Sequence, residues 1–481
     1  MSLKRTALVT ALWSMGESWG MKIVSAGVFL LLARLIEPSA FGLAALAQVY
    51  LMAVQTISDQ GLTTALIQRE TIEEAHKDSA FWANLGVGLV LMILTIAFAG
   101  PLADLYGEPR LAPVLRWYSL APLLTSVSVV QIGLARRELR FRDLALRQTA
   151  SALIGGAVGV VMAFAGMGVW ALVGQGLVSQ AVGVVILWAI VAWRPRFAFS
   201  RRHFADLFGF GFNVLATNLL RILGGQADRL LLGFYFGATE VGYYSVAQRL
   251  VSIITDFVAG STERAVVPLF SRIQEDRERV ARGLITAQRL LSLTVIPAFI
   301  GLAAIAPSLI RVGVGDQWEP SILPTRILAF FSLAYCLGFF FGHVVTALGR
   351  PTIRLGVVTA QAVTQVGLSL IGVRWGIPGV AVAVAATQII FYGVELTVLR
   401  RLVRFPLGAY LGEALVPSLG AAAMAAAVLG FETLVTGESP ALQLGAGVVL
   451  GTVVYVAVLL LFARGRLREL VQMAKGLRAR S

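Results

Sequence analysis

Long runs of hydrophobic residues, separated by short polar stretches, follow one another along almost the whole chain. Each run holds about 20 residues, the length at which an α-helix crosses the hydrocarbon core of a bilayer. Read against charged residues, glycine and proline, the runs predict about 14 membrane spans. We place these spans at residues 11–33, 40–66, 80–102, 111–135, 148–165, 169–193, 209–236, 241–266, 284–311, 322–347, 355–373, 377–399, 411–435 and 441–463. The pattern therefore predicts an all-α polytopic membrane protein, because a transmembrane barrel would show short alternating segments instead.

The composition supports a membrane protein. Of the 481 residues, 57% are hydrophobic and 14% are charged, whereas a soluble domain carries about 25% charged residues. The chain has 40 Lys and Arg residues against 26 Asp and Glu residues, which gives a net charge of +14. In a membrane protein such an excess indicates basic cytoplasmic loops, so we expect no nucleic-acid partner.

The positions of the cations test the order of the spans. If the N-terminus is placed on the inner side, nearly all Lys and Arg residues between the predicted spans fall in inner segments. The four that fall in outer segments are Arg34, Arg110, Arg311 and Arg374. An even number of spans returns the chain to its starting side, so we expect both termini in the cytoplasm.

The predicted loops are too short for a catalytic domain on the outer side. The longest inner links are residues 136–147 and 194–208, in which Phe and Arg residues interleave. Such a link could lie along the anionic leaflet of the membrane, or it could be a plain solvated connector. Without an outer domain, we expect the protein not to be an enzyme.

A sequence repeat divides the predicted spans into two halves. Residues 32–50 resemble residues 232–250, with identical Leu, Gly, Ala and Gln residues two hundred positions apart. The same separation is expected if the first six spans are duplicated as the next six. Because six is even, both halves keep one orientation, which makes a parallel repeat. We therefore expect a six-helix lobe at 1–208, a second at 209–400, and two extra helices with a basic cytoplasmic tail at 401–481.

Short motifs spread over residues 1–400 resemble the Wzx-type polysaccharide transporters, which are the oligosaccharide flippases of the multidrug/oligosaccharidyl-lipid/polysaccharide exporter superfamily. The motifs stand in the order that the family has. They are Leu12-Trp13-Ser14, Leu32-Ala33-Arg34-Leu35 with Pro38-Ser39-Ala40-Phe41-Gly42-Leu43, Ser58-Asp59-Gln60-Gly61 with Leu66-Ile67-Gln68-Arg69, Asp228-Arg229-Leu230-Leu231-Leu232-Gly233, Gly242-Tyr243-Tyr244-Ser245, Gly315-Asp316-Gln317-Trp318 and Leu348-Gly349-Arg350-Pro351.

The resemblance implies a transport function. A member of this family would move undecaprenyl-diphosphate-linked oligosaccharide units across the bacterial inner membrane for O-antigen, capsule or exopolysaccharide synthesis. Its partners would be the lipid-linked glycan, the bilayer, and a glycan polymerase with its assembly proteins. We expect transport by alternating access between the two lobes.

Cations at the middle of predicted spans are the first candidates for a substrate site. Lys22 and Arg221 both lie at such depth, and they correspond across the repeat to within one residue. A cation there costs about 2.5–3.5 kcal/mol on insertion scales, so it should face a watery cavity or a counter-charge. A lipid-linked diphosphate would supply that negative charge.

Two further cations could hold the diphosphate later in its passage. Arg229 and Arg249 lie about 10 Å from the outer boundary, at 1.5 Å per helical residue. The alternative interpretation is that they neutralise Asp228 and Asp256.

Other unusual residues within or beside the spans have structural interpretations. Cations near span ends can extend their charged groups to the membrane surface; these are Arg116, Arg264, Arg289 and Arg326. Prolines in or beside the ninth span could kink it; these are Pro297, Pro307 and Pro320.

The acids most suited to face a cavity are Glu17, Asp59 and Asp228. Each could couple transport to protons or sodium, or could be the partner in a salt bridge. We expect no organic cofactor and no metal site, because His76, His203 and His343 are far apart in the sequence and lack the spacing of metal ligands.

Two other functions remain as alternatives. A drug/cation antiporter of the same superfamily would need acids facing the cavity, whereas this sequence places cations at the midplane. A membrane polysaccharide polymerase or lipid-sugar glycosyltransferase would need a large outer loop or paired acids near the surface. The sequence contains no phosphate-binding Gly-Lys-Ser/Thr loop, which argues against ATP hydrolysis.

Overall fold

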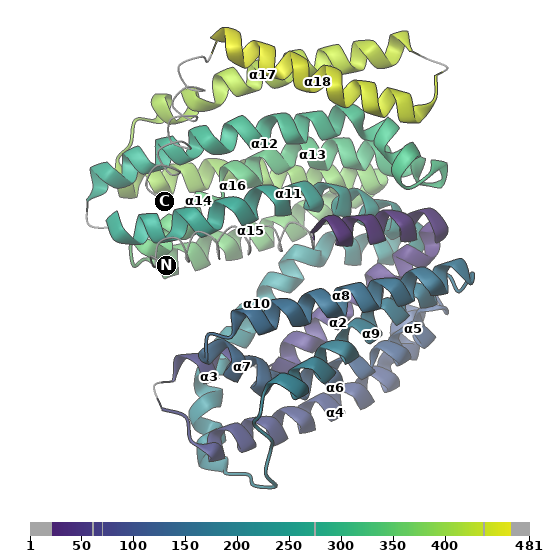
Figure 1. Ribbon diagram of the computed structural model, residues 1–481, viewed down its shortest axis with the longest axis vertical. Helices are drawn as coiled ribbons and strands as arrows, with labels where there is room; N and C mark the ends of the chain where they lie inside the picture. Colours follow the sequence, from purple (N-terminus) through teal and green to yellow (C-terminus); the bar gives the residue numbers. More distant parts are fainter. Residues whose placement is uncertain (1–21, 60–61, 70, 274–275, 436–437, 463–481) are drawn as a thin grey trace, which may run out of the picture. The chain divides into compact units, whose positions relative to one another are not determined.

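The protein is a succession of long helices (Figure 1). The computed structural model describes residues 22–59, 62–69, 71–273, 276–435 and 438–462. Every regular element in these residues is a helix, and 10 helical segments among them are long and apolar enough to cross a membrane. The prediction of an all-α polytopic membrane protein is therefore confirmed.

The described parts of the first six predicted spans fall on helices or on rows of shorter helices, and residues 11–21 of the first span lie outside the described residues. The first described stretch of helix is residues 22–35. It is followed by α2 (Pro38–Asp59), α3 (Leu62–Gln68), α4 (Glu74–Leu105), α5 (Leu111–Tyr118), α6 (Leu120–Ser126), α7 (Val129–Arg137), α8 (Phe141–Phe164) and α9 (Val169–Ile190). The predicted span 111–135 is thus a row of three short helices, α5 to α7. Pro113 and Pro122 lie in the first turns of α5 and α6, where a missing N–H breaks no helical hydrogen bond.

The remaining eight predicted spans also coincide with helices. They are α10 (Arg201–Phe236), α11 (Ala238–Ile273), α12 (Arg277–Gly313), η1 (Asp316–Ser321) with α13 (Ile322–Leu337) and α14 (Phe340–Ala347), α15 (Pro351–Gly372), η2 (Val373–Trp375) with α16 (Gly376–Val403), α17 (Leu407–Leu434) and α18 (Pro440–Phe462). Hydropathy located these helices well because a hydrophobic run is a local property of the sequence.

Two helices begin at positions that correspond across the repeat predicted from the sequence. The helices α2 and α11 start at Pro38 and Ala238, two hundred residues apart. Their first turns cross so closely that only glycine fits. A Cβ atom on Gly42 would lie 1.6 Å from the carbonyl oxygen of Ala238, and one on Gly242 would lie 2.1 Å from that of Pro38. The matching glycines of the repeat are therefore required by this contact.

The chain folds as two compact units. The N-terminal unit comprises Gly27–Ser245 and Gln365–Gly376, and the C-terminal unit comprises Met1–Ala26, Val246–Thr364 and Ile377–Ser481. These units are defined by compactness and the predicted lobes by sequence duplication, so the lobe boundaries at 208 and 400 stay a prediction.

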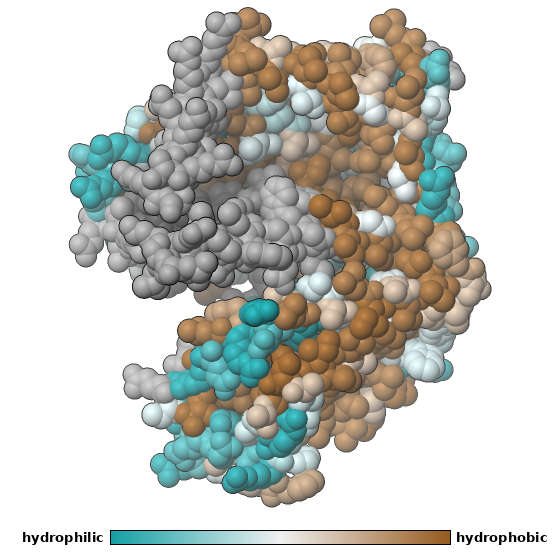
Figure 2. All heavy atoms as spheres, viewed as in Figure 1, coloured by the Kyte–Doolittle hydropathy of each residue, from teal (hydrophilic) through white to brown (hydrophobic). Residues whose placement is uncertain are grey.

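The N-terminal unit has its core where α3, α4 and α7 meet. Leu62, Leu66, Phe81, Val130 and Leu134 are buried together there. In the same unit, Figure 2 shows hydrophobic residues along α8 and hydrophilic residues gathered near α3 and α7. This distribution suits a helical unit that exposes apolar sides to lipid and polar ends to water.

The C-terminal unit is organised around α12, against which α17 and α18 pack (Figure 1). Apolar side chains from these helices form one buried cluster; they include Leu293, Ile296, Met424 and Leu459. The two helices outside the predicted duplication are thus integral to the core of this unit.

Two prolines interrupt the hydrogen bonding of α12, and each interruption is repaired from another helix. Pro297 has no N–H to donate to the carbonyl of Leu293, and the hydroxyl of Tyr455 donates to that oxygen at 2.9 Å. Pro307 likewise leaves the carbonyl of Ala303, to which Nε of Arg326 donates at 3.2 Å. The interpretation of Arg326 as a residue extending to the membrane surface is therefore corrected: its guanidinium satisfies the backbone.

Candidate functional site

Two of the four cations predicted to bind a diphosphate lie on neighbouring helices of the C-terminal unit. Lys22 lies in the helical residues 22–35, and its Nζ donates to the carbonyl oxygen of Asp256 on α11. One turn along the same helix, the hydroxyl of Ser25 accepts from Nη2 of Arg249 at 3.0 Å. Both cations are half-buried, so one ammonium group and one guanidinium group lie where these two helices meet.

A third predicted cation, Arg229, lies in the N-terminal unit. Its Nη1 donates to Oε1 of Gln226, one turn earlier on α10, at 3.1 Å. The preceding residue, Asp228, is buried and accepts from the hydroxyl of Tyr244 at 2.7 Å and from the backbone N–H of Arg229 at 2.9 Å. Asp228 therefore ties α10 to the first turns of α11, a contact that neither interpretation from the sequence anticipated.

Asp59, another of the three acids predicted to face a cavity, lies at the end of α2. Its carboxylate accepts from the hydroxyl of Thr63 on α3 at 2.5 Å, and it is half-buried. This bond spans the break between α2 and α3. The contact fits the interpretation of Asp59 as a structural residue.

Two predicted site residues are not placed. Glu17 lies outside the described residues, and Arg221 lies on α10 with a side chain that the structure does not describe. The correspondence of Lys22 and Arg221 across one cavity therefore stays a prediction.

One buried ion pair was missed by reading the sequence. Arg289 on α12 donates through Nε and Nη2 to the two carboxylate oxygens of Glu413 on α17, at 3.0 Å and 2.9 Å. The Glu413 side chain is only 9% exposed. The interpretation of Arg289 as a cation that extends to the surface is thus corrected: a bidentate pair neutralises it inside the unit. The only signal in the sequence is that each of these two predicted spans carries a charge of opposite sign.

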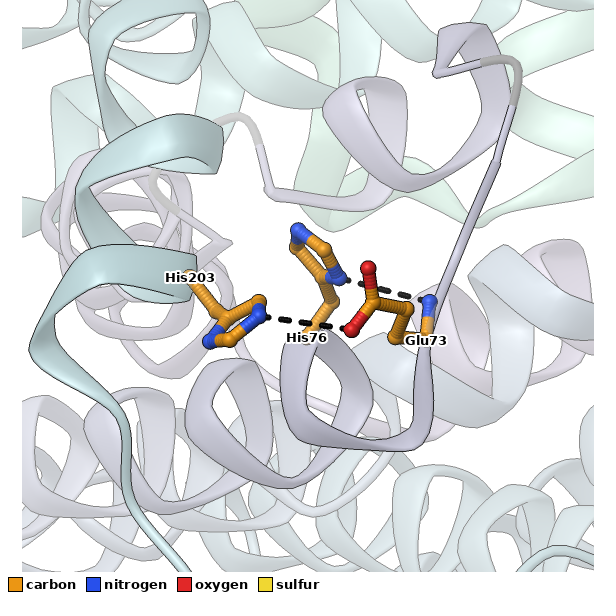
Figure 3. Close-up of side chains that lie close together, drawn as sticks. All are labelled: Glu73, His76 and His203. Carbon is orange, nitrogen blue, oxygen red and sulfur yellow. Dashed lines mark hydrogen bonds and ion pairs between the residues drawn. The ribbon is translucent and has the colours of Figure 1, made fainter.

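The argument against a metal site from sequence spacing is corrected for two of the three histidines. His76 lies in the first turn of α4 and His203 in the first turn of α10, and their ring centroids are 4.5 Å apart. Glu73, directly before α4, places a carboxylate oxygen 3.5 Å from Nε2 of His203 (Figure 3). Distance along the chain is a poor guide here, because the packing of α4 on α10 brings their starts together. His343 lies in α14 beside Phe339.

The two links that the sequence predicts on the inner side are shorter than predicted, and the second of them is held by hydrogen bonds. The link predicted at 136–147 is only the turn between α7 and α8. The link predicted at 194–208 consists of residues 191–200, followed by the start of α10. The carbonyl oxygen of Arg196 accepts from Nε1 of Trp82 at 2.7 Å, and its N–H donates to Asp78 at 3.0 Å. This link is therefore fastened to α4, and the Phe197 ring, although 95% exposed, stacks on the Trp82 ring of that helix with the ring centroids 4.8 Å apart.

Comparison with known proteins identifies relatives across nearly the whole chain. Residues 31–323, more than half of the chain, match the family model described as polysaccharide biosynthesis protein. The succinoglycan biosynthesis transport protein ExoT of Rhizobium meliloti is 29% identical over 473 residues, which cover 96% of this chain and 94% of that protein. The lipopolysaccharide biosynthesis protein WzxC of Escherichia coli is 25% identical over 73% of this chain and 72% of that protein. A probable low-salt glycan biosynthesis flippase of Haloferax volcanii is 25% identical over 89% of this chain and 90% of that protein.

Solved structures share the fold. The lipid II flippase MurJ, in an inward closed conformation, matches with a TM-score of 0.79 at 17% identity, covering 95% of this chain and all of that chain. An inward-facing multidrug resistance MATE family transporter matches with a TM-score of 0.64 at 16% identity, covering 80% of this chain and 94% of that chain. The predicted architecture is thus that of known polytopic helical transporters.

Proposed function

Because the chain belongs to the family of polysaccharide biosynthesis proteins, we propose that it is a flippase that moves lipid-linked oligosaccharides across a membrane. The observation that carries this proposal is the similarity to a succinoglycan transport protein over 96% of the chain. As in the resemblance drawn from the motifs, the substrate is an oligosaccharide on undecaprenyl diphosphate. The protein acts in the bacterial inner membrane with both termini in the cytoplasm, and it passes the glycan to polymerising and assembly proteins.

The diphosphate is the part of this substrate that the membrane disfavours most. A doubly charged group must leave the headgroup layer, and it needs compensating cations along its route. Lys22 and Arg249 are suited to this task, since they lie half-buried on adjacent helices. Arg offers two parallel N–H donors to a phosphate, and Lys offers a point charge that can follow a moving ligand. Arg221 and Arg229 on α10 are the other two residues that we propose to bind the diphosphate.

Coupling to an ion gradient is the second part of the proposal. A carboxylate beside these cations would take up a proton more readily once an anionic diphosphate arrives, because the bound anion favours the neutral acid. Asp228, which directly precedes Arg229 in the chain, is the first candidate for this role, and Glu17 and Asp59 are the further candidates. The hydroxyl of Tyr244 holds Asp228 in place for such a role.

Reconstitution in vesicles tests the proposal. The wild-type protein should accelerate the crossing of a fluorescent undecaprenyl-diphosphate sugar, and it should leave a cationic dye unmoved. Arg249→Gln and Arg221→Ala should slow the crossing by roughly 10- to 100-fold, since a hydrogen bond to a charged group contributes about 1.5–3 kcal/mol. Arg221→Lys should keep part of the rate, because its charge remains.

The control is Arg311→Gln, which removes an exposed ion pair with Glu319 at 3.0 Å and should leave the crossing unchanged. Movement of the dye without movement of the lipid would replace the proposal with a drug antiporter. An imposed proton or sodium gradient that changes the rate in the wild type but not in Asp228→Asn would support coupling through Asp228. Equal rates with and without either gradient would refute it.

A further inference from the structure

The cluster of Glu73, His76 and His203 has the composition of a metal site. Each residue offers one ligand atom, and these three atoms lie within 4.8 Å of one another. Two imidazole nitrogens with one carboxylate oxygen are a ligand set that zinc adopts in proteins, with a fourth position left for water. The cluster lies wholly within the N-terminal unit, where the first turns of α4 and α10 meet (Figure 3).

The distance between two of the ligand atoms suits a small divalent cation. Two ligands that each lie 2.0–2.1 Å from a tetrahedral zinc ion are about 3.3 Å apart. Nε2 of His203 and the carboxylate of Glu73 are separated by 3.5 Å, close to that value. Small shifts at the exposed Glu73 side chain would bring the set to full coordination.

His76 gives the second, independent observation. This side chain is 1% exposed, and its Nε2 atom has no hydrogen-bond partner. Its other nitrogen, Nδ1, faces Glu73 and accepts a long hydrogen bond of 3.3 Å from the Glu73 backbone N–H. The His76 ring is therefore buried with only this one long hydrogen bond, which caps the start of α4.

A metal ion would take the lone pair of Nδ1 in place of this long hydrogen bond. With Nδ1 as the ligand, Nε2 keeps its proton and points to the carboxylate of Asp206, which lies 3.9 Å away. A carboxylate behind a metal-bound histidine fixes the orientation of the ring and strengthens the ligand. Asp206 is itself held by Arg69 at 3.4 Å, and His203 is oriented by Ser200 through its Nδ1 at 2.6 Å.

We propose that Glu73, His76 and His203 bind one Zn²⁺ ion, which clamps the start of α10 onto the start of α4. Nothing in the proposed flipping of glycans requires this ion. The site joins two elements that the fastened link 191–200 also brings together, so zinc stabilises the end of the N-terminal unit at which α10 begins.

Zinc binding by the full-length protein in detergent tests the proposal. After chelator treatment and titration with Zn²⁺ alone, the wild type should hold about one zinc ion per chain, measured by mass spectrometry of the metal. Zinc should also raise the thermal unfolding midpoint, because a ligand that binds only the folded state stabilises it. His203→Gln and Glu73→Gln change partly exposed side chains and should fold, yet they should weaken binding by at least about tenfold.

The matched control is His343→Gln, which removes the one histidine outside the cluster and should bind zinc as the wild type does. Asp206→Asn should weaken binding by about 10- to 100-fold while leaving the stoichiometry unchanged. Equal zinc contents in the wild type and His203→Gln would overturn the proposal. So would a wild type that takes up no zinc, even if the variants changed its stability, because the cluster would then be only a contact between two helices.

Discussion

The two prolines in α12 each leave a backbone carbonyl without its helical donor, and a different side chain donates to each of these carbonyls. At Pro297 the freed carbonyl of Leu293 receives a neutral phenol hydroxyl from α18, whereas at Pro307 that of Ala303 receives a charged guanidinium from α13. Within a bilayer no water is available to replace the missing backbone donor, so another side chain must supply it. A cation within a span is thus not by itself a sign of a substrate site.

The comparison also separates two kinds of arginine in the C-terminal unit. Arg326 donates to the backbone and Arg289 pairs with Glu413, so both serve the assembly of the unit around α12. Arg249 instead donates a hydrogen bond to Ser25, which lies on the same helix as Lys22. The sequence separated these residues only by their distance from the span ends, whereas the contacts in the structure show which groups each cation meets.

The largest loss of stability is expected when the hydrogen bond from the Arg326 guanidinium to the Ala303 carbonyl is removed. Arg326→Met keeps most of the apolar length of the side chain but leaves the Ala303 carbonyl without its donor. The free energy of unfolding should fall by about 1.5–3 kcal/mol, the range for hydrogen bonds that involve a charged group. Equilibrium unfolding in mixed micelles measures this change.

Arg311→Met on the same helix is its control. That arginine forms an exposed pair with Glu319, and such pairs contribute about 0–1 kcal/mol. If the two variants lose equal stability, the hydrogen bond to Ala303 is not what Arg326 contributes.

Removing the hydrogen bond from the neutral Tyr455 hydroxyl to the Leu293 carbonyl should reduce stability less. Tyr455→Phe removes one hydroxyl and changes little else in the buried cluster around Leu293 and Met424. Interhelical hydrogen bonds in membrane proteins contribute about 0.6–1.7 kcal/mol, so the loss should be about 1 kcal/mol. The same unfolding assay measures it, with Tyr235→Phe, at a ring that is 55% exposed, as the variant that should change nothing. If Tyr455→Phe lowers the free energy of unfolding as much as Arg326→Met does, the charged and the neutral hydrogen bond contribute equally.

Much of the fold could be predicted from the sequence because spans and turns are local. Hydropathy located the helices, and the repeat of residues 32–50 anticipated the start of α11 two hundred residues after that of α2. The prolines of α12 were visible too, and each one identifies the carbonyl it frees four residues earlier. Which side chain repairs that carbonyl depends on how helices pack, and so Arg326 was assigned to the membrane surface.

The candidate site was predicted less completely for the same reason. Lys22, Arg229, Arg249 and Asp228 were selected by depth and charge, but their neighbours on other helices were not foreseeable. His76 and His203 meet only because α10 returns to the start of α4. These contacts join segments that are distant in the sequence, and a single sequence contains few signs of them.

The smallest effect is expected when the interruption itself is removed. Pro297→Ala restores an N–H four residues after Leu293, so the helix can satisfy that carbonyl without Tyr455. In this background Tyr455→Phe should cost less than about 0.5 kcal/mol, compared with about 1 kcal/mol when the proline is present. The difference is the coupling between the two positions, and a double-mutant cycle of four unfolding measurements isolates it. If Tyr455→Phe costs the same free energy of unfolding with and without Pro297, Tyr455 does not serve as the replacement donor. The two proline sites would then resemble each other in geometry alone.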